Sequence, residues 1–189
     1  ILDQERGRKL FDAISGNSPF LSQIIEQEAE FALHLFKNGP EKTFADILQR
    51  LNAWRDQKNY TNEIMPFLRR SKKQVALVIA VADIAGGWSI EKVMGRLSEF
   101  AEKAISLACC HILARQSQEG KIQIKHTHNP EKSSGYFILA LGKLGARELN
   151  YSSDVDLVVF YDPVVLGANK SGAVSQIAIQ ATKSLVRIL

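Results

Sequence analysis

The sequence contains very little cysteine. Its 189 residues include only two, and these are the neighbours Cys109 and Cys110. Two adjacent thiols cannot build a disulfide framework, and they lack the spacing of metal ligands. They also fall in an apolar stretch with helical periodicity. We therefore interpret both as buried, reduced thiols and expect a cytoplasmic protein.

A long hydrophobic run is also missing. The most apolar stretch, VALVIAVADIAGGW from Val75, is interrupted by Asp83 and is too short to span a bilayer. The first ten residues, ILDQERGRKL, carry charges where a secretory signal needs an apolar core. We expect a core helix and no membrane partner. Because the chain begins at Ile1 and stops at Leu189 inside an expected helix, we expect it to be a fragment.

The sequence has no concentrated basic tract with interleaved aromatic residues, which single-stranded nucleic-acid channels use. The net charge is +4, but lysines and arginines are scattered, and the densest cluster is Arg69-Arg70-Ser71-Lys72-Lys73. This argues against a template-directed polymerase, and we expect no nucleic-acid partner. The cluster indicates a solvated helix face, with a phosphate-binding patch as the alternative.

Helical spacing of apolar residues dominates the first 118 residues. Ser18 is a candidate helix cap because Pro19 follows it at the first helical position, and Thr43 and Ser89 are candidate caps further on. Four helices are expected, with limits at Ser18 and Gly39, Thr43 and about Trp54, about Pro66 and Gly86, and Ser89 and Gly120.

After Gly120 the period changes. Strands are expected at Lys121–Lys125, Tyr136–Leu141 and Val155–Tyr161, a loop over residues 163–172 and a helix from Ala173. His126 and His128 fall in a linking loop, where their spacing suits either a metal or a solvated turn. The expected fold class is α+β, with a helical domain at 1–118 and the first part of a second domain at 119–189.

Two aspartates lie at the start of the last expected strand, in the stretch NYSSDVDLVVF from Asn150. Alternate side chains of a strand share a face, so Asp154 and Asp156 are expected to project the same way. Neighbouring carboxylates repel each other, and a divalent cation offsets that repulsion. Mg²⁺ is commonly shared between one or two carboxylates and substrate phosphates. The pair thus indicates phosphoryl or nucleotidyl transfer, with a solvated strand end as the alternative.

The turn before the aspartates suits a nucleotide. Gly142 and Gly145 let backbone amides approach a phosphate, and the hydroxyls of Ser152 and Ser153 can donate to phosphate oxygens. Lys143 and Arg147 add positive charge nearby. A strand, a glycine turn, serines and then Asp-x-Asp predict a site for a nucleotide triphosphate or its products.

The stretch LGKLGARELNYSSDVDLVVFYD, from Leu141 to Asp162, resembles the nucleotidyltransferase signature of bacterial glutamine synthetase adenylyltransferase/adenylyl-removing enzymes, a branch of the polymerase-β-like superfamily. The matching positions are Gly142, Lys143, Gly145, Glu148, Ser153, Asp154 and Asp156. The helical stretch from Phe67, FLRRSKKQVALVIAVADIAGG, also resembles the family, although Ser71-Lys72-Lys73 departs from its usual continuation. The resemblance implies a helical part followed by a truncated polymerase-β-like core.

The resemblance implies that Asp154 and Asp156 are catalytic and bind Mg²⁺, and that the nucleotide phosphates are held by Gly142, Lys143, Ser152 and Ser153. It implies ATP or ADP and inorganic phosphate as substrates or products. The third carboxylate usual in the superfamily would follow Leu189, so residues 1–189 alone are expected to be inactive.

The sequence ELNYSSD resembles the corresponding stretch in the amino-terminal half of these enzymes. That half is the adenylyl-removing one, which phosphorolyses adenylyl-tyrosine on glutamine synthetase. The implied partners are glutamine synthetase and a PII-type nitrogen signalling protein. Two alternatives stay open: the adenylyl-transferring half, which uses ATP, and a helical interaction module without catalysis.

Overall fold

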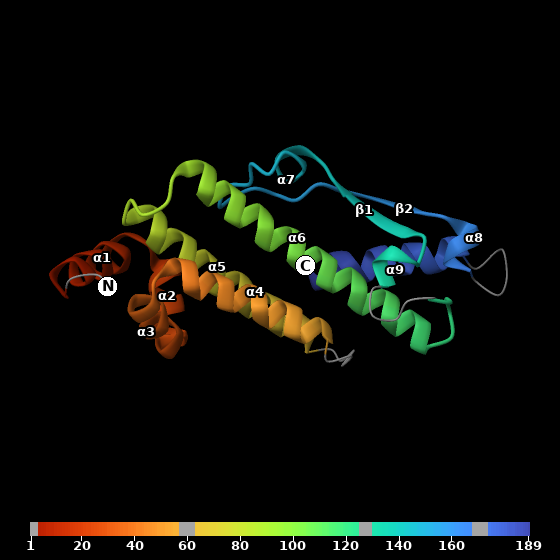
Figure 1. The fold of residues 1–189 in the computed structure, drawn as a ribbon, viewed down its shortest axis with the longest axis horizontal. Helices are drawn as coiled ribbons and strands as arrows, with labels where there is room; N and C mark the ends of the chain where they lie inside the picture. Colours follow the sequence, from red (N-terminus) through yellow and green to blue (C-terminus); the bar gives the residue numbers. More distant parts are fainter. Residues whose placement is uncertain (1–3, 57–62, 125–129, 168–173) are drawn as a thin grey trace.

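The computed structural model describes residues 4–56, 63–124, 130–167 and 174–189. It is an elongated molecule in which long helices lie side by side and a two-stranded ribbon runs along one of them (Figure 1). His126 and His128 lie outside the described residues, so their predicted role stays a prediction.

Helices make up the described part of the chain up to residue 118. They are α1 (Gln4–Asn17), α2 (Pro19–Gln27), α3 (Ala29–Asn38), α4 (Pro40–Asp56), α5 (Ile64–Ile84) and α6 (Ile90–Gln118). Helices α4, α5 and α6 pack against one another (Figure 1). The apolar stretch from Val75 lies at their centre, where Leu77, Val78 and Ile79 are fully buried. It is the core helix that the sequence predicts, because removing these side chains from water stabilises the bundle.

Two predicted helix caps are confirmed. The Ser18 hydroxyl accepts a hydrogen bond from the Leu21 amide, and Pro19 opens α2. The Ser89 hydroxyl accepts one from the Lys92 amide at the start of α6. Each cap satisfies an N–H group that has no partner within the helix. Neither α5 nor any other described helix combines the length and apolar character needed to cross a bilayer.

Two helical predictions are wrong. The single helix expected from Ser18 to Gly39 is broken at Glu28, whose backbone (φ −125°, ψ 43°) is not helical and joins α2 to α3. Thr43 is not a cap, because α4 already begins at Pro40. Its hydroxyl donates instead to the Gly39 carbonyl at 2.8 Å. A proline at the first helical position fixes φ and needs no N–H partner, so α4 starts at Pro40, before the predicted cap.

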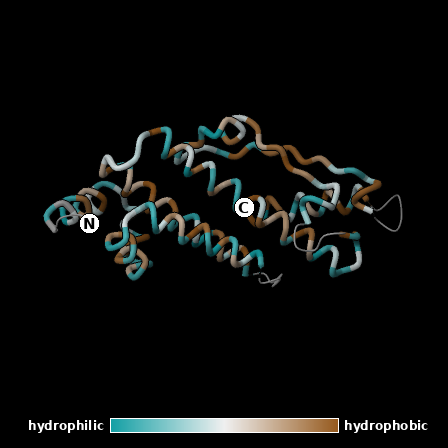
Figure 2. The backbone as a smooth tube through the Cα atoms, viewed as in Figure 1, coloured by the Kyte–Doolittle hydropathy of each residue, from teal (hydrophilic) through white to brown (hydrophobic). Residues whose placement is uncertain are grey.

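The sheet has two antiparallel strands, β1 (Tyr136–Ala140) and β2 (Leu157–Tyr161), with Tyr136 opposite Tyr161 and Ala140 opposite Leu157. Figure 2 shows that the two strands are largely hydrophobic. Ile138 and Leu157 on one face pack against the core, whereas Phe137 and Phe160 stack on the other face and are exposed.

The strand predicted at Lys121–Lys125 is wrong for the described residues 121–124, which form no strand. The alternating pattern there has another cause. Ile122 is buried in the helical core and Ile124 packs against it, while Lys121 faces solvent. A period of two reports burial on one side, and it occurs here without a neighbouring strand.

The remaining elements are η1 (Pro130–Lys132), α7 (Gly142–Gly145), α8 (Pro163–Leu166) and α9 (Val174–Ile188). The loop predicted over 163–172 is wrong for residues 163–166, which form α8, because the Asp162 carboxylate accepts from the Val164 and Val165 amides and caps that turn. Helix α9 is confirmed and packs against α6.

The described residues are mostly helical with one small sheet, which is compatible with the α+β class. The division at residues 118 and 119 and the polymerase-β-like core stay predictions.

Candidate active site

Two glycines shape the turn that follows β1. Gly142 has a φ of +54°, a backbone conformation that residues with a Cβ rarely adopt. Gly145 lies against the preceding strand, since a Cβ there would come within 2.6 Å of the Ala140 carbonyl oxygen. The first glycine therefore supplies a backbone conformation, and the second allows a close approach. The expected approach of their backbone amides to a phosphate stays a prediction.

The sheet brings Asp156 to this turn. The Leu141 amide donates to the Asp156 carbonyl at 2.8 Å, which continues the pairing of β1 and β2 beyond Ala140 and Leu157. The Asp156 carboxylate then lies so close to Gly142 that a Cβ on the glycine would be 3.2 Å from Oδ2. Gly142 thus keeps space open in front of the carboxylate.

Asp154 and Asp156 are not part of a strand, which corrects the expectation that the strand begins at Val155. Strand β2 begins at Leu157, and both aspartates precede it. The alternation argument for their orientation therefore does not apply, and backbone pairing with Leu141 is what positions Asp156. Both residues are exposed, and no group in the described ranges forms a hydrogen bond or ion pair with either carboxylate.

The two serines have different environments. The Ser153 hydroxyl accepts from the Asn150 amide at 3.0 Å and donates to Asn150 Oδ1 at 2.7 Å. The Ser152 amide also donates to Asn150 Oδ1, at 3.1 Å. Since a hydroxyl has one proton, Ser153 is committed to the turn. The Ser152 hydroxyl is exposed and makes no hydrogen bond with the described residues.

The basic residues of the turn also differ. Lys143 is exposed on α7, and its ammonium group contacts no described carboxylate. Arg147 has a φ of +60° and pairs with Glu102 of α6 at 3.2 Å. Arg147 therefore ties the turn to the helical part, and Lys143 is the cation of the two that has no carboxylate partner among the described residues.

Three contacts that the sequence analysis did not identify anchor the turn. The Tyr151 hydroxyl donates to Asp83 Oδ2 of α5 at 3.0 Å, and the Leu149 amide donates to the buried Ser98 hydroxyl of α6 at 3.4 Å. Burial and the Asp83 carboxylate raise the pKa of Tyr151 well above its ordinary range. Asn150 is the third, and an Asn before Ser-Ser is a turn signal that could have revealed it.

The donor set fits a Mg²⁺ ion that is shared with a substrate. No group of three or more His, Cys, Asp or Glu side chains able to hold a metal occurs among the described residues. Mg²⁺ keeps several waters and binds one or two carboxylates together with phosphate oxygens. Asp154 and Asp156 offer such an ion one or two carboxylates without described protein partners, and they do not provide an all-protein cage.

Comparisons with known proteins show the family of the chain. The family model described as Glutamate-ammonia ligase adenylyltransferase matches residues 9–189. The chain is 31% identical over 182 residues to a bifunctional glutamine synthetase adenylyltransferase/adenylyl-removing enzyme of Bradyrhizobium sp. (strain BTAi1), covering 96% of this chain and 18% of that protein.

A protein of the same description from Rhizobium meliloti (strain 1021) is 50% identical over 101 residues, which is 53% of this chain and 10% of that protein. The chain thus spans less than a fifth of the length of these curated relatives. Since the family model covers nearly all of it, the chain belongs to the glutamate-ammonia ligase adenylyltransferase family.

Proposed function

We propose that the chain is part of the adenylyl-removing half of a nucleotidyltransferase that acts on glutamine synthetase. The observation that carries this proposal is the Asp156 carboxylate, held by strand pairing against Gly142, with Asp154 two residues before it. Both carboxylates lack partners in the described chain, so their oxygens are available to a cation. The relatives' names, which include both adenylyl transfer and adenylyl removal, support the substrate.

Asp154 and Asp156 are the proposed catalytic residues and hold Mg²⁺. When bound, Mg²⁺ supplies positive charge that stabilises the negative charge on the phosphoryl oxygens. Gly142 provides room for a phosphate beside Asp156. Lys143 and Ser152 have the free ammonium and hydroxyl groups that can bind phosphate oxygens, whereas Ser153 shapes the turn through Asn150.

The proposed reaction is a phosphorolysis. An oxygen of inorganic phosphate attacks the phosphorus of adenylyl-tyrosine, the bond from phosphorus to the tyrosyl oxygen breaks, and ADP forms. The tyrosyl oxygen takes up a proton and becomes the unmodified tyrosine. Charge develops on the phosphoryl oxygens during the attack, which is where fixed positive groups accelerate phosphoryl transfer most.

The adenylyl-transferring reaction needs the same carboxylates, with ATP as donor and pyrophosphate as product. The resemblance of the ELNYSSD sequence to the amino-terminal half favours adenylyl removal over adenylyl transfer. The family also implies control by a PII-type protein and work in the cytosol, where the thiols of Cys109 and Cys110 stay reduced.

The direction is tested with the polypeptide extended past Leu189. Adenylylated glutamine synthetase with phosphate is expected to give ADP, and unmodified glutamine synthetase with ATP is expected to give no pyrophosphate. Pyrophosphate without ADP would assign the chain to the transferring half. Neither product from a folded protein would support the helical interaction module. Residues 1–189 alone are expected to give no product, because a third carboxylate is expected past Leu189.

A further inference from the structure

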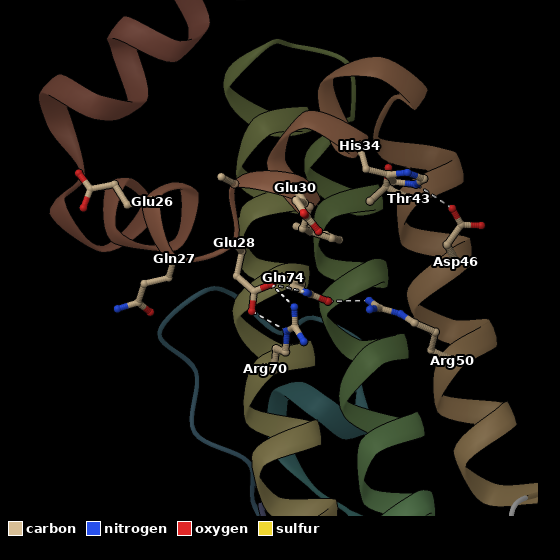
Figure 3. A pocket seen from close by; sticks show the side chains of 12 residues that line it. Glu26, Gln27, Glu28, Glu30, His34, Thr43, Asp46, Arg50, Arg70 and Gln74 are labelled. Atoms are coloured by element: carbon tan, nitrogen blue, oxygen red, sulfur yellow. Dashed lines mark hydrogen bonds and ion pairs between the residues drawn. The ribbon is translucent and has the colours of Figure 1, made fainter.

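The basic cluster on α5 is divided between two faces of the helix. Arg70 faces the junction of α2 and α3, where its Nε and Nη2 donate to Glu28 at 2.6 and 2.7 Å (Figure 3). Gln74, fully buried one turn later, donates to Glu28 at 3.0 Å and accepts from Arg50 at 2.5 Å (Figure 3). Arg70 is therefore used to hold the helical part together.

The other three cations of the cluster line a groove of about 750 Å³. Arg69, Lys72 and Lys73 are exposed, and their spacing of three and four residues places them on one face of α5. Lys73 donates to the Gln27 amide oxygen at 3.4 Å. Within the described ranges no carboxylate lies within ion-pair distance of these three. Like charges at this spacing repel one another, so an anion in the groove would be bound favourably.

The groove leads from these cations to the proposed active site. Its floor continues along the same face of α5 through Ala76 and Ala80. Phe20 and Ile84, both more than half exposed, add apolar surface to its walls. Tyr151 and Ser152 close one side, and Ser152 is two residues from Asp154. The Asp83 carboxylate also lines the groove, where it accepts from the Tyr151 hydroxyl.

We propose that this groove binds an acidic, extended segment of the protein substrate. Carboxylates of the segment would pair with Arg69, Lys72 and Lys73, and an apolar side chain would cover Phe20 and Ile84. A negatively charged partner complements the three cations of the groove. The exposed apolar surface of Phe20 and Ile84 beside these cations indicates that the partner is a protein. The inference rests on the proposed function, because the wall formed by Ser152 places the segment beside the reaction centre.

The test compares two variants of the extended polypeptide that have the same change in charge. The groove variant is Arg69→Glu/Lys72→Glu/Lys73→Glu. The control is Lys37→Glu/Lys42→Glu/Lys183→Glu, at exposed positions on α3, α4 and α9. We expect the groove variant to raise the KM for adenylylated glutamine synthetase at least tenfold, with kcat and the KM for phosphate within twofold of the parent. The control variant should keep a KM for adenylylated glutamine synthetase within twofold of the parent's value. Added salt should raise the parent's KM for this substrate.

Affinity is measured separately from turnover, so that failure of this inference and failure of the proposed function are distinguishable. The Asp154→Asn protein is titrated with adenylylated glutamine synthetase, with and without the groove substitutions. A tenfold loss of affinity supports the groove whether or not the parent turns over. Stronger competition by a single-stranded DNA oligonucleotide than by polyglutamate would assign the groove to nucleic acid and overturn the inference.

Three other results would also overturn it. Equal effects of the two triple variants would mean that only net charge matters. A lower kcat with unchanged KM would place the cations in the chemistry. A lower Tm for the groove variant alone would mean that the cations already bind a segment of their own polypeptide.

Discussion

The Asp156 carboxylate lies against the backbone of Gly142, where a Cβ would be 3.2 Å from Oδ2. This contact joins the first residue of α7 to the residue before β2, and the hydrogen bond between the Leu141 amide and the Asp156 carbonyl lies beside it. It makes the glycine part of the proposed site. The size of the residue at position 142 should therefore affect activity separately from stability.

Gly142→Ala is expected to reduce turnover at least tenfold. It should also lower the free energy of unfolding by about 1–2 kcal/mol, because φ at this position is +54°. Gly120→Ala is the matched control, since Gly120 has a φ of +68° and open space around its Cβ position. Urea unfolding and ADP formation measure the two effects. Loss of activity in both variants to the same extent would contradict the role of the contact.

Gly145→Ala is expected to destabilise the fold by about 1–3 kcal/mol through overpacking. A Cβ there would meet the Ala140 carbonyl oxygen at 2.6 Å, so the turn or the end of β1 must shift. Gly95→Ala, in the second turn of α6, has no atom within 4 Å of the Cβ and should stabilise by about 0.5–1 kcal/mol. Thermal unfolding of the two variants checks the opposite signs, and a stable Gly145→Ala protein would refute the close approach.

Cys109 and Cys110 are expected to resist iodoacetamide at pH 8 and to react in urea. Burial raises the pKa of Cys109 from 9.0 to about 12, and burial together with a hydrogen bond to Glu131 at 2.7 Å raises that of Cys110 further. The thiols therefore stabilise the fold fully below pH 9, and this contribution is lost as the pH rises towards 12. Mass spectrometry measures the labelling, and rapid labelling of the native protein would contradict the burial.

Arg70→Ala is expected to cost about 1 kcal/mol of stability, at the low end for a charged hydrogen bond because Arg70 is exposed. Arg69→Ala should leave stability unchanged, since Arg69 has no partner among the described residues. The hydrogen bond from Arg70 lowers the pKa of Glu28, so the contribution is present above about pH 4.5 and is lost as the pH falls further. Urea unfolding at pH 7 and pH 3.5 checks both statements. Equal costs for the two variants would be inconsistent with the division of the cluster.

The sequence predicts most of the helical architecture because its signals there are local. Ser18 and Ser89 are confirmed caps, and the apolar stretch from Val75 is confirmed as the core helix. The sequence contains no local signal for the break at Glu28, and the side-chain partners of Glu28 there are Arg70 and Gln74, more than forty residues away. Ile122 shows the converse case, in which a local strand pattern reflects burial against helices.

The composition of the candidate site comes from the sequence, and the structure changes the expected geometry. The Asp-x-Asp pair and the two glycines are visible in the sequence, but the contact of Asp156 with Gly142 comes from pairing of β1 with β2, which are separated by residues 141–156. Strand alternation gave the wrong reason for the position of Asp156. The anchors Asp83 and Ser98 come from helices distant in the sequence, so nothing local could identify them.

The central claim is that Asp154 and Asp156 bind the metal for phosphorolysis. It is tested most directly by ADP formation from adenylylated glutamine synthetase and phosphate, in the extended polypeptide with Mg²⁺. Asp154→Asn and Asp156→Asn are each expected to lower the rate at least a hundredfold without lowering Tm, because neither carboxylate has a described protein partner. Asp162→Asn, which keeps the oxygen that caps α8, should retain the parent rate. Parent-level ADP formation by either site variant would contradict the account.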